Sequence, residues 1–106
     1  MLRSAARDNG LHDGALTDVG EFLAMMRESL VMQRERYVES MDLFQADRSH
    51  LRTLLWNKGY RHQQLDDAVH TRTSRARGLL ERQQERIQQL AGYVEEQTKY
   101  LSAFRH

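Results

Sequence analysis

The sequence predicts an all-α protein: an antiparallel coiled-coil hairpin of two long amphipathic helices with a bend near residues 56–60. Three observations favour this fold. Proline, which breaks helix interiors, is absent from all 106 residues. Charged residues make up 29% of the chain and aromatic residues only 8%, which suits elongated helices with a large solvated surface. Apolar residues recur every three or four positions on both sides of the bend, as they do along one helical face.

Residues 1–17 are predicted to form an irregular N-terminal segment, because Asp8-Asn9-Gly10 and Asp13-Gly14 are turn-forming sequences. The first helix is predicted to begin at Asp18. Its carboxylate can cap the helix, and Glu21, three residues later, completes a capping box. The first seven residues are basic and contain no acid, so a short mitochondrial presequence is the alternative to a frayed terminus.

One apolar stripe runs along the first helix with a mean step of about 3.6 residues. Arg34 and Arg48 occupy positions within this stripe. A charged residue there can fix the register of a coiled coil, or it can extend its head past the seam into water. The predicted core residues of this helix are Leu23, Met26, Leu30, Tyr37, Met41, Phe44, Leu51 and Leu55.

The stripe resumes after Gly59 with a mean step close to 3.5 residues, which is the coiled-coil value. Arg72 and Gln83 fill gaps in it. The segment 70–78 is the predicted weak point, since it is poor in apolar residues and Gly78 costs about 1 kcal/mol relative to alanine. The predicted core residues of the second helix are Leu65, Val69, Leu80, Ile87, Leu90, Val94, Leu101 and Phe104.

The bend decides between two folds. Gly59 can adopt the left-handed conformation that ends a helix, and Asn57 is a turn residue. The alternative is one continuous long helix, because the spacing of three and four residues runs through Gly59 without a break. The hairpin is favoured, since two packed helices cover each other's apolar stripes and a lone rod leaves its stripe bare.

Some apolar residues lie beside the two main stripes and are predicted to stay partly exposed in an isolated hairpin. A chain of this kind is expected to bind protein partners, as a homo-oligomer or within a hetero-assembly. These residues are Phe22, Met25, Val31, Val38, Leu54, Leu79 and Tyr93.

Two groups of residues are candidates for partner binding. Trp56 and Tyr60 flank the bend and could either dock onto a partner or cover the end of the two-helix core. Four arginines recur at helical spacing, and such a strip can bind nucleic acid or an acidic protein, or can simply be solvated. They are Arg72, Arg75, Arg82 and Arg86.

No metal or cofactor is predicted. His62, Asp66 and His70 are spaced four residues apart and share a helical face, but a zinc site needs a further ligand and none is placed near them. A solvated polar strip is the favoured interpretation. Cysteine is absent, and no phosphate-binding loop, nucleophile elbow or pair of carboxylates occurs, so the chain is predicted not to be an enzyme.

The length of the chain and the tryptophan and glycine at the bend resemble small secreted helical hairpins with a Trp-x-Gly bend. Trp56 and Gly59 are one residue too far apart for that motif. Those proteins also carry a C-terminal Tyr-x-x-x-acid element, and here Tyr93 is followed at the fourth position by Gln97. The chain is therefore not assigned to that family.

The favoured function is a structural or adaptor subunit of a cytoskeletal, flagellar or organelle assembly. The alternatives are a small export chaperone or secreted hairpin of a secretion system, and a nucleic-acid-binding module acting through the arginines between Arg72 and Arg86. No apolar run approaches the roughly 20 residues that span a bilayer. The expected location is intracellular, either cytoplasmic or cytoskeletal, with the mitochondrion as the alternative.

Overall fold

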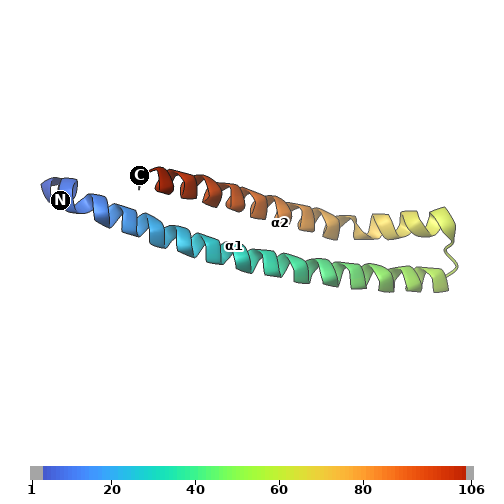
Figure 1. Cartoon of the computed structure of the whole chain (residues 1–106). Coiled ribbons are helices and arrows are strands. Elements are labelled where there is room, and N and C mark those ends of the chain that lie inside the picture. Colours follow the sequence, from blue (N-terminus) through green and yellow to red (C-terminus); the bar gives the residue numbers. More distant parts are fainter. Residues whose placement is uncertain (1–3, 105–106) are drawn as a thin grey trace. The chain divides into compact units, whose positions relative to one another are not determined.

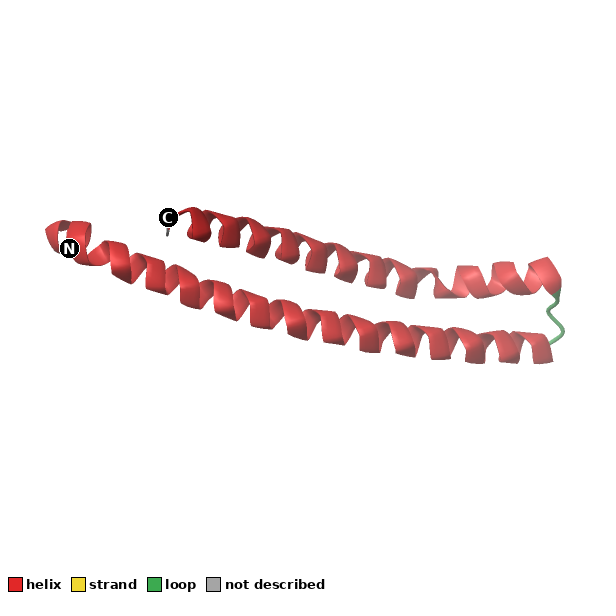
Figure 2. Cartoon of the chain, viewed as in Figure 1, coloured by secondary structure: helices red, strands yellow, loops and turns green. Residues whose placement is uncertain are grey.

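The computed structural model describes the backbone of residues 4–104 and the side chains of residues 18–103. Helix α1 spans Ser4–Asn57 and helix α2 spans His62–Phe104, as labelled in Figure 1. Residues 58–61 connect them (green in Figure 2), and residues 4–104 contain no strand. The predicted all-α helical hairpin is confirmed, and the alternative of one continuous helix is wrong.

Helix α1 begins earlier than the sequence predicts. It starts at Ser4, so residues 4–17 are helical rather than irregular, and Asp18 lies inside the helix instead of capping it. The glycines at 10 and 14 each cost about 1 kcal/mol in a helix relative to alanine. Unlike proline, however, they keep the backbone N–H, so the helical hydrogen bonds can continue through them.

The chain divides into two compact units, which we describe separately. The turn unit is Gln33–Ile87 and contains the end of α1, the connection and the start of α2. The terminal unit is formed by Met1–Met32 and Gln88–His106, the start of α1 and the end of α2. In the terminal unit the guanidinium of Arg27 donates to Thr98 Oγ1 at 2.7 Å, which joins the two helices.

The helices of the turn unit are antiparallel with a register that polar contacts define. Tyr37 of α1 donates its hydroxyl to Gln84 of α2 at 3.4 Å. Nearer the connection, Arg52 Nη2 lies 2.8 Å from Asp66 Oδ1. Residue numbers therefore rise along α1 while those of the facing residues fall along α2: between the two contacts the chain passes from 37 to 52 on α1 and from 84 to 66 on α2.

The inner face of the two helices follows the predicted stripes. Six predicted core residues are half-buried: Met26, Tyr37, Met41, Phe44, Leu51 and Leu90. The side chain of Phe104 lies outside the described residues. Nine predicted core residues are at most 9% exposed: Leu23, Leu30, Leu55, Leu65, Val69, Leu80, Ile87, Val94 and Leu101.

Thr73 occupies the buried position on α2 that the sequence analysis assigned to Arg72. Thr73 is 8% exposed, whereas Arg72 is exposed. Its hydroxyl donates to the carbonyl of Val69 at 2.8 Å and accepts from Arg77 Nη1 at 2.9 Å, so it is satisfied although buried. The difference arises because the inner face advances by four residues at two consecutive steps, from Leu65 to Val69 and on to Thr73.

The arginines within the predicted stripes keep their side chains in solvent. Arg34 and Arg48 are both exposed, as is Arg72. Of the two interpretations offered by the sequence, the structure supports the one in which the charged heads extend past the seam. The physical reason is that burying an unpaired charge costs far more free energy than the burial of its aliphatic stem can return.

Helix α1 ends in a Schellman motif, which explains the bend. The backbone N–H of Tyr60 donates to the carbonyl of Leu55, and that of Gly59 donates to the carbonyl of Trp56, both at 3.0 Å. Gly59 has a φ of 103°, a conformation that side-chain-bearing residues rarely adopt. Tyr60 then packs against the buried cluster of Leu55, Leu65 and Val69, the hydrophobic contact that accompanies this motif.

Replacing Gly59 by alanine is expected to lower the free energy of unfolding by about 1–2 kcal/mol, because the Cβ of alanine is disfavoured at this positive φ. The matched control is Gly20→Ala in the middle of α1, which should raise it by up to about 1 kcal/mol. A Cβ built at either position meets nothing within 4 Å, so only backbone conformation differs. Chemical denaturation followed by circular dichroism measures both, and equal effects of the two substitutions would contradict the assignment of Gly59 as the helix terminator.

Candidate protein-binding site

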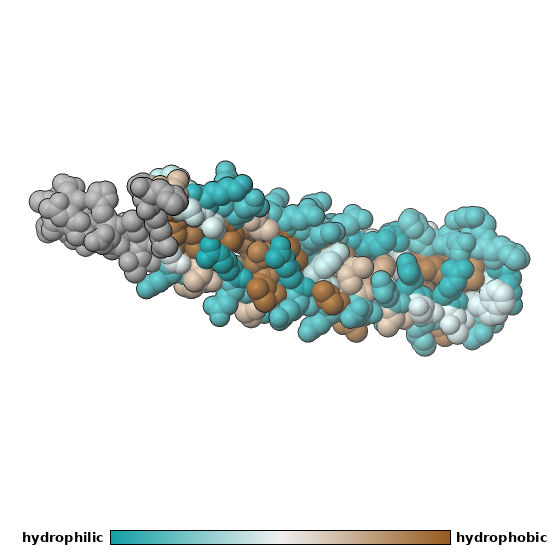
Figure 3. All heavy atoms as spheres, in the orientation of Figure 1, coloured by the Kyte–Doolittle hydropathy of each residue, from teal (hydrophilic) through white to brown (hydrophobic). Residues whose placement is uncertain are grey.

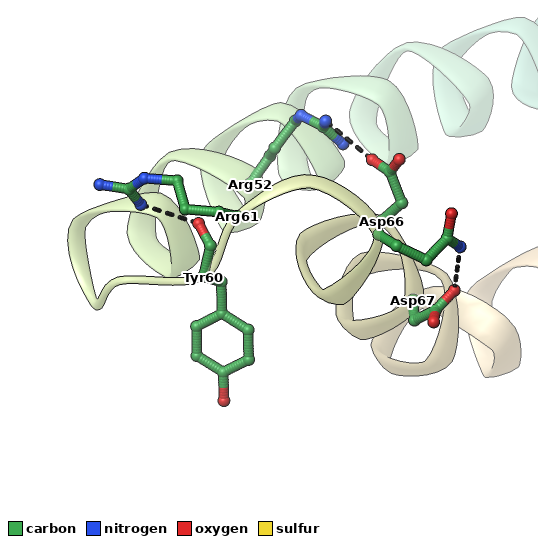
Figure 4. A network of polar contacts seen from close by, with 6 residues as sticks. Arg52, Tyr60, Arg61, Asp66 and Asp67 are labelled. Carbon is green, nitrogen blue, oxygen red and sulfur yellow. Dashed lines mark hydrogen bonds and ion pairs between the residues drawn. The ribbon is translucent and has the colours of Figure 1, made fainter.

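The end of the turn unit carries Trp56 and Tyr60 in different environments. Trp56 is 49% exposed, and the guanidinium carbon of Arg61 lies 3.6 Å from its ring centroid. The same guanidinium donates to the carbonyls of Trp56 at 2.6 Å and Tyr60 at 2.8 Å (Figure 4 shows the second bond). Tyr60 is half-buried on the Leu55 cluster. Of the two aromatic residues, Trp56 is the one that presents a surface, and Arg61 already covers one face of its ring.

One flank of the turn unit is basic. A hollow of about 400 Å³ is lined by polar groups of both helices, chiefly Arg48, Arg52, His70 and Arg77, which we call the basic flank. Arg52 is paired with Asp66 (Figure 4), the sole acid lining the hollow. Arg77 donates to the carbonyl of His70 at 3.1 Å and to Thr73, both uncharged acceptors. This flank therefore carries a positive charge in excess of its acids.

A second hollow of the turn unit is lined by more apolar residues and has one acid and one base, and we call it the apolar groove. It measures about 630 Å³ and lies between α1 and α2. Leu43 of α1 is 66% exposed and Leu79 of α2 is 54% exposed, and both line it. Asp47 and Arg72 also line it. The remaining lining residues are Ser40, Phe44, Leu51, Thr73, Ala76, Leu80 and Gln83.

Apolar side chains are also exposed on the terminal unit. On α1 they include Val19, Phe22, Met25 and Met32, at steps of three and seven residues that keep them near one side of the helix. Figure 3 shows brown apolar residues open to solvent among teal hydrophilic ones. An exposed stripe with this spacing is the kind of surface that packs against another amphipathic helix.

The seven residues that the sequence predicted to remain partly exposed are between 41% and 66% exposed, so that prediction is confirmed. Sequence reasoning missed Leu43 and Met32. Both lie beside the main stripe of α1. Their sequence spacing from other apolar residues beside the stripe, such as Phe22 and Met25, could have indicated that they stay exposed. The spacing alone does not show that Leu43 of α1 and Leu79 of α2 line the same groove.

The four predicted arginines on α2 are all exposed and share one side of the helix with Leu79. Arg72 approaches the ring of Tyr60 at 5.8 Å, and none of the four forms an ion pair within the described part of the chain. An apolar residue in the middle of the strip fits a protein surface better than a phosphate backbone, which offers no apolar contact.

Two of the three residues considered for zinc contact other side chains. Asp66 is bonded to Arg52, and the ring of His70 lies 3.1 Å from Arg77 Nη2. His62 is the first residue of α2 and has a positive φ of 50°. Within the described residues no group of three or more histidine, cysteine or acidic side chains converges on a common point.

Comparison with protein-family models, with curated proteins and with solved structures finds no match to this chain. None of the described helices combines the length and the apolar character needed to cross a membrane.

Proposed function

We propose that the chain is a non-catalytic structural or adaptor subunit, a coiled-coil hairpin that packs its exposed apolar faces against other proteins of a larger assembly. One observation carries the proposal. Among the residues with described side chains, twelve large hydrophobic residues are exposed and only nine hydrophobic residues are buried. Covering such surface stabilises by about 25 cal/mol per Å², so a partner supplies stabilisation that the hairpin alone lacks.

The arrangement of these residues supports a helical protein partner. In both units the exposed apolar residues follow helices at helical spacing, as the surfaces between helices of a bundle do. Charges of both signs separate them, and the net charge of the whole chain is +1, which gives no strong field for a polyanion. Cytoskeletal, flagellar and organelle complexes are the assemblies in which we expect such a subunit.

The alternatives make different use of the same chain. An export chaperone or a secreted hairpin would bind through the same apolar residues, but it would release its partner or leave the cell with it. A nucleic-acid-binding module would depend on Arg72, Arg75, Arg82 and Arg86, and its affinity would fall steeply as salt rises. Stable partner binding that persists at raised salt supports the assembly subunit against both.

The test is cross-linking in the native cell followed by mass spectrometry, with a surface variant beside the wild type. The double substitution Phe22→Gln with Met25→Gln changes side chains that are 48% and 66% exposed. We expect it to reduce partner recovery by about tenfold or more, as loss of an interface anchor does, while circular dichroism shows unchanged helix content. The control pair, Ala24→Gln with Glu28→Gln, lies on other exposed positions of the same helix. Equal recovery for both pairs would contradict the proposal.

A further inference from the structure

We infer that a second copy of this chain docks on the apolar groove, face to face, with a two-fold axis parallel to the helices. In this dimer α1 of each copy lies over α2 of the other, and four helices form a bundle around the two grooves. The inference rests on the proposed function and names one partner for it. It comes from the register of the turn unit and from the charges on the groove.

The register fixes the heights of the groove residues along the two helices. Tyr37 contacts Gln84, and Arg52 contacts Asp66 further toward the connection. Interpolating between these contacts along the antiparallel helices puts Leu43 level with position 77, two residues or about 3 Å along α2 from Leu79. It likewise puts Asp47 level with Arg72, with all four residues on the same groove.

A two-fold axis parallel to the helices exchanges α1 and α2 across the interface and keeps every residue at its own height. Leu43 of one copy then lies near Leu79 of the other, with a height difference of about 3 Å. Asp47 of one copy faces Arg72 of the other, and symmetry makes both pairs twice. The groove is thus complementary to itself in charge and in apolar character.

The other face-to-face arrangement has its axis perpendicular to the helices and does not pair these charges. It would lay α1 on α1 and α2 on α2 with reversed heights, so Asp47 would lie near Ser40 and Arg72 near Gln83. Both charged side chains are exposed, and neither forms an ion pair within the described residues. The parallel axis supplies the opposite charge that each of them lacks.

The charges of the two hollows decide which of them can face a second copy. The basic flank carries Arg48, Arg77 and His70, and two copies of it would bring like charges together. The apolar groove exposes two leucines and carries one acid and one base. Of these two surfaces of the turn unit, the groove is the one that can meet a copy of itself without repulsion and with apolar surface to remove from water.

Charge reversal tests the arrangement by sedimentation equilibrium of the full chain. Asp47→Arg or Arg72→Asp alone places like charges opposite each other twice, and we expect each to raise the dimer dissociation constant by about tenfold or more. The double variant restores opposite charges, and its dissociation constant should return to within about threefold of the wild type. Asp42→Arg, an exposed reversal that does not line the groove, is the control and should leave dimerisation unchanged.

A second test locates the contact. The chain has no cysteine, so Leu43→Cys and Leu79→Cys each introduce a unique thiol. A short thiol-specific cross-linker should join the two variants to each other when they are mixed, and should join neither efficiently to itself. Cross-linking of each variant only to itself would overturn the parallel axis.

A wild-type chain that stays monomeric at all concentrations, or a double charge variant that dimerises no better than the single ones, would also overturn the inference. Partner recovery from the native cell is a separate measurement. A chain that is monomeric but still recovers its partners would contradict the dimer and would remain compatible with the proposed function.

Discussion

Replacing Leu55 by alanine is expected to lower the free energy of unfolding by about 2–5 kcal/mol, the usual cost of deleting a large aliphatic side chain from a packed core. Leu55 is 4% exposed and forms a buried cluster with Leu65 and Val69. Its carbonyl also accepts the hydrogen bond from Tyr60 that closes α1. The loss is large relative to the total, because small folded units are stable by only about 5–15 kcal/mol.

The neighbouring Leu54 provides a matched control for this measurement. It belongs to the same helical turn and has the same chemistry, but it is 45% exposed. Leu54→Ala should therefore cost less than about 1 kcal/mol, since little of its surface leaves water on folding. Urea denaturation followed by circular dichroism compares the two variants. Similar losses for both would show that α1 does not pack on α2 through the face described above.

The second large effect is expected on dilution. The isolated chain should behave as an oligomer, or as a partly melted helix whose melting depends on concentration, because among the residues with described side chains the exposed large hydrophobic ones outnumber the buried hydrophobic ones. For a dimer that unfolds to monomers, a tenfold rise in concentration adds about 1.4 kcal/mol to the apparent stability of the dimer. That corresponds to a rise of a few degrees in the melting midpoint.

Thermal melts at several concentrations, combined with sedimentation, measure this dependence. A comparison of the wild type with Asp47→Arg separates folding from association, because Asp47 is exposed and makes no ion pair within the described part of the chain. A monomer with a sharp, high and concentration-independent melt would show that the hairpin is self-sufficient. The proposal of an assembly subunit would then lose its main physical support.

The sequence by itself determined that the chain forms long helices and which hydrophobic residues they bury most deeply. Helix follows from the absence of proline and from steps of three and four residues, which place Leu23 and Leu30 on one side of α1 and Ile87 and Val94 on one side of α2. The position of the bend followed from Gly59, the residue in that stretch with the freedom to adopt a positive φ. These properties are local, so a single chain segment is sufficient to define them.

Only the tertiary structure decided which of two compatible folds forms and which side chains meet. The apolar spacing continues through Gly59, so periodicity is the same in a hairpin and in a rod. The start of α1 at Ser4 and the burial of Thr73 in place of Arg72 were likewise decided by how the segments continue and pack. The apolar groove exists only because the packing of the two helices brings Leu43 of α1 and Leu79 of α2 to the same hollow, and that is a property of two helices rather than of either sequence alone.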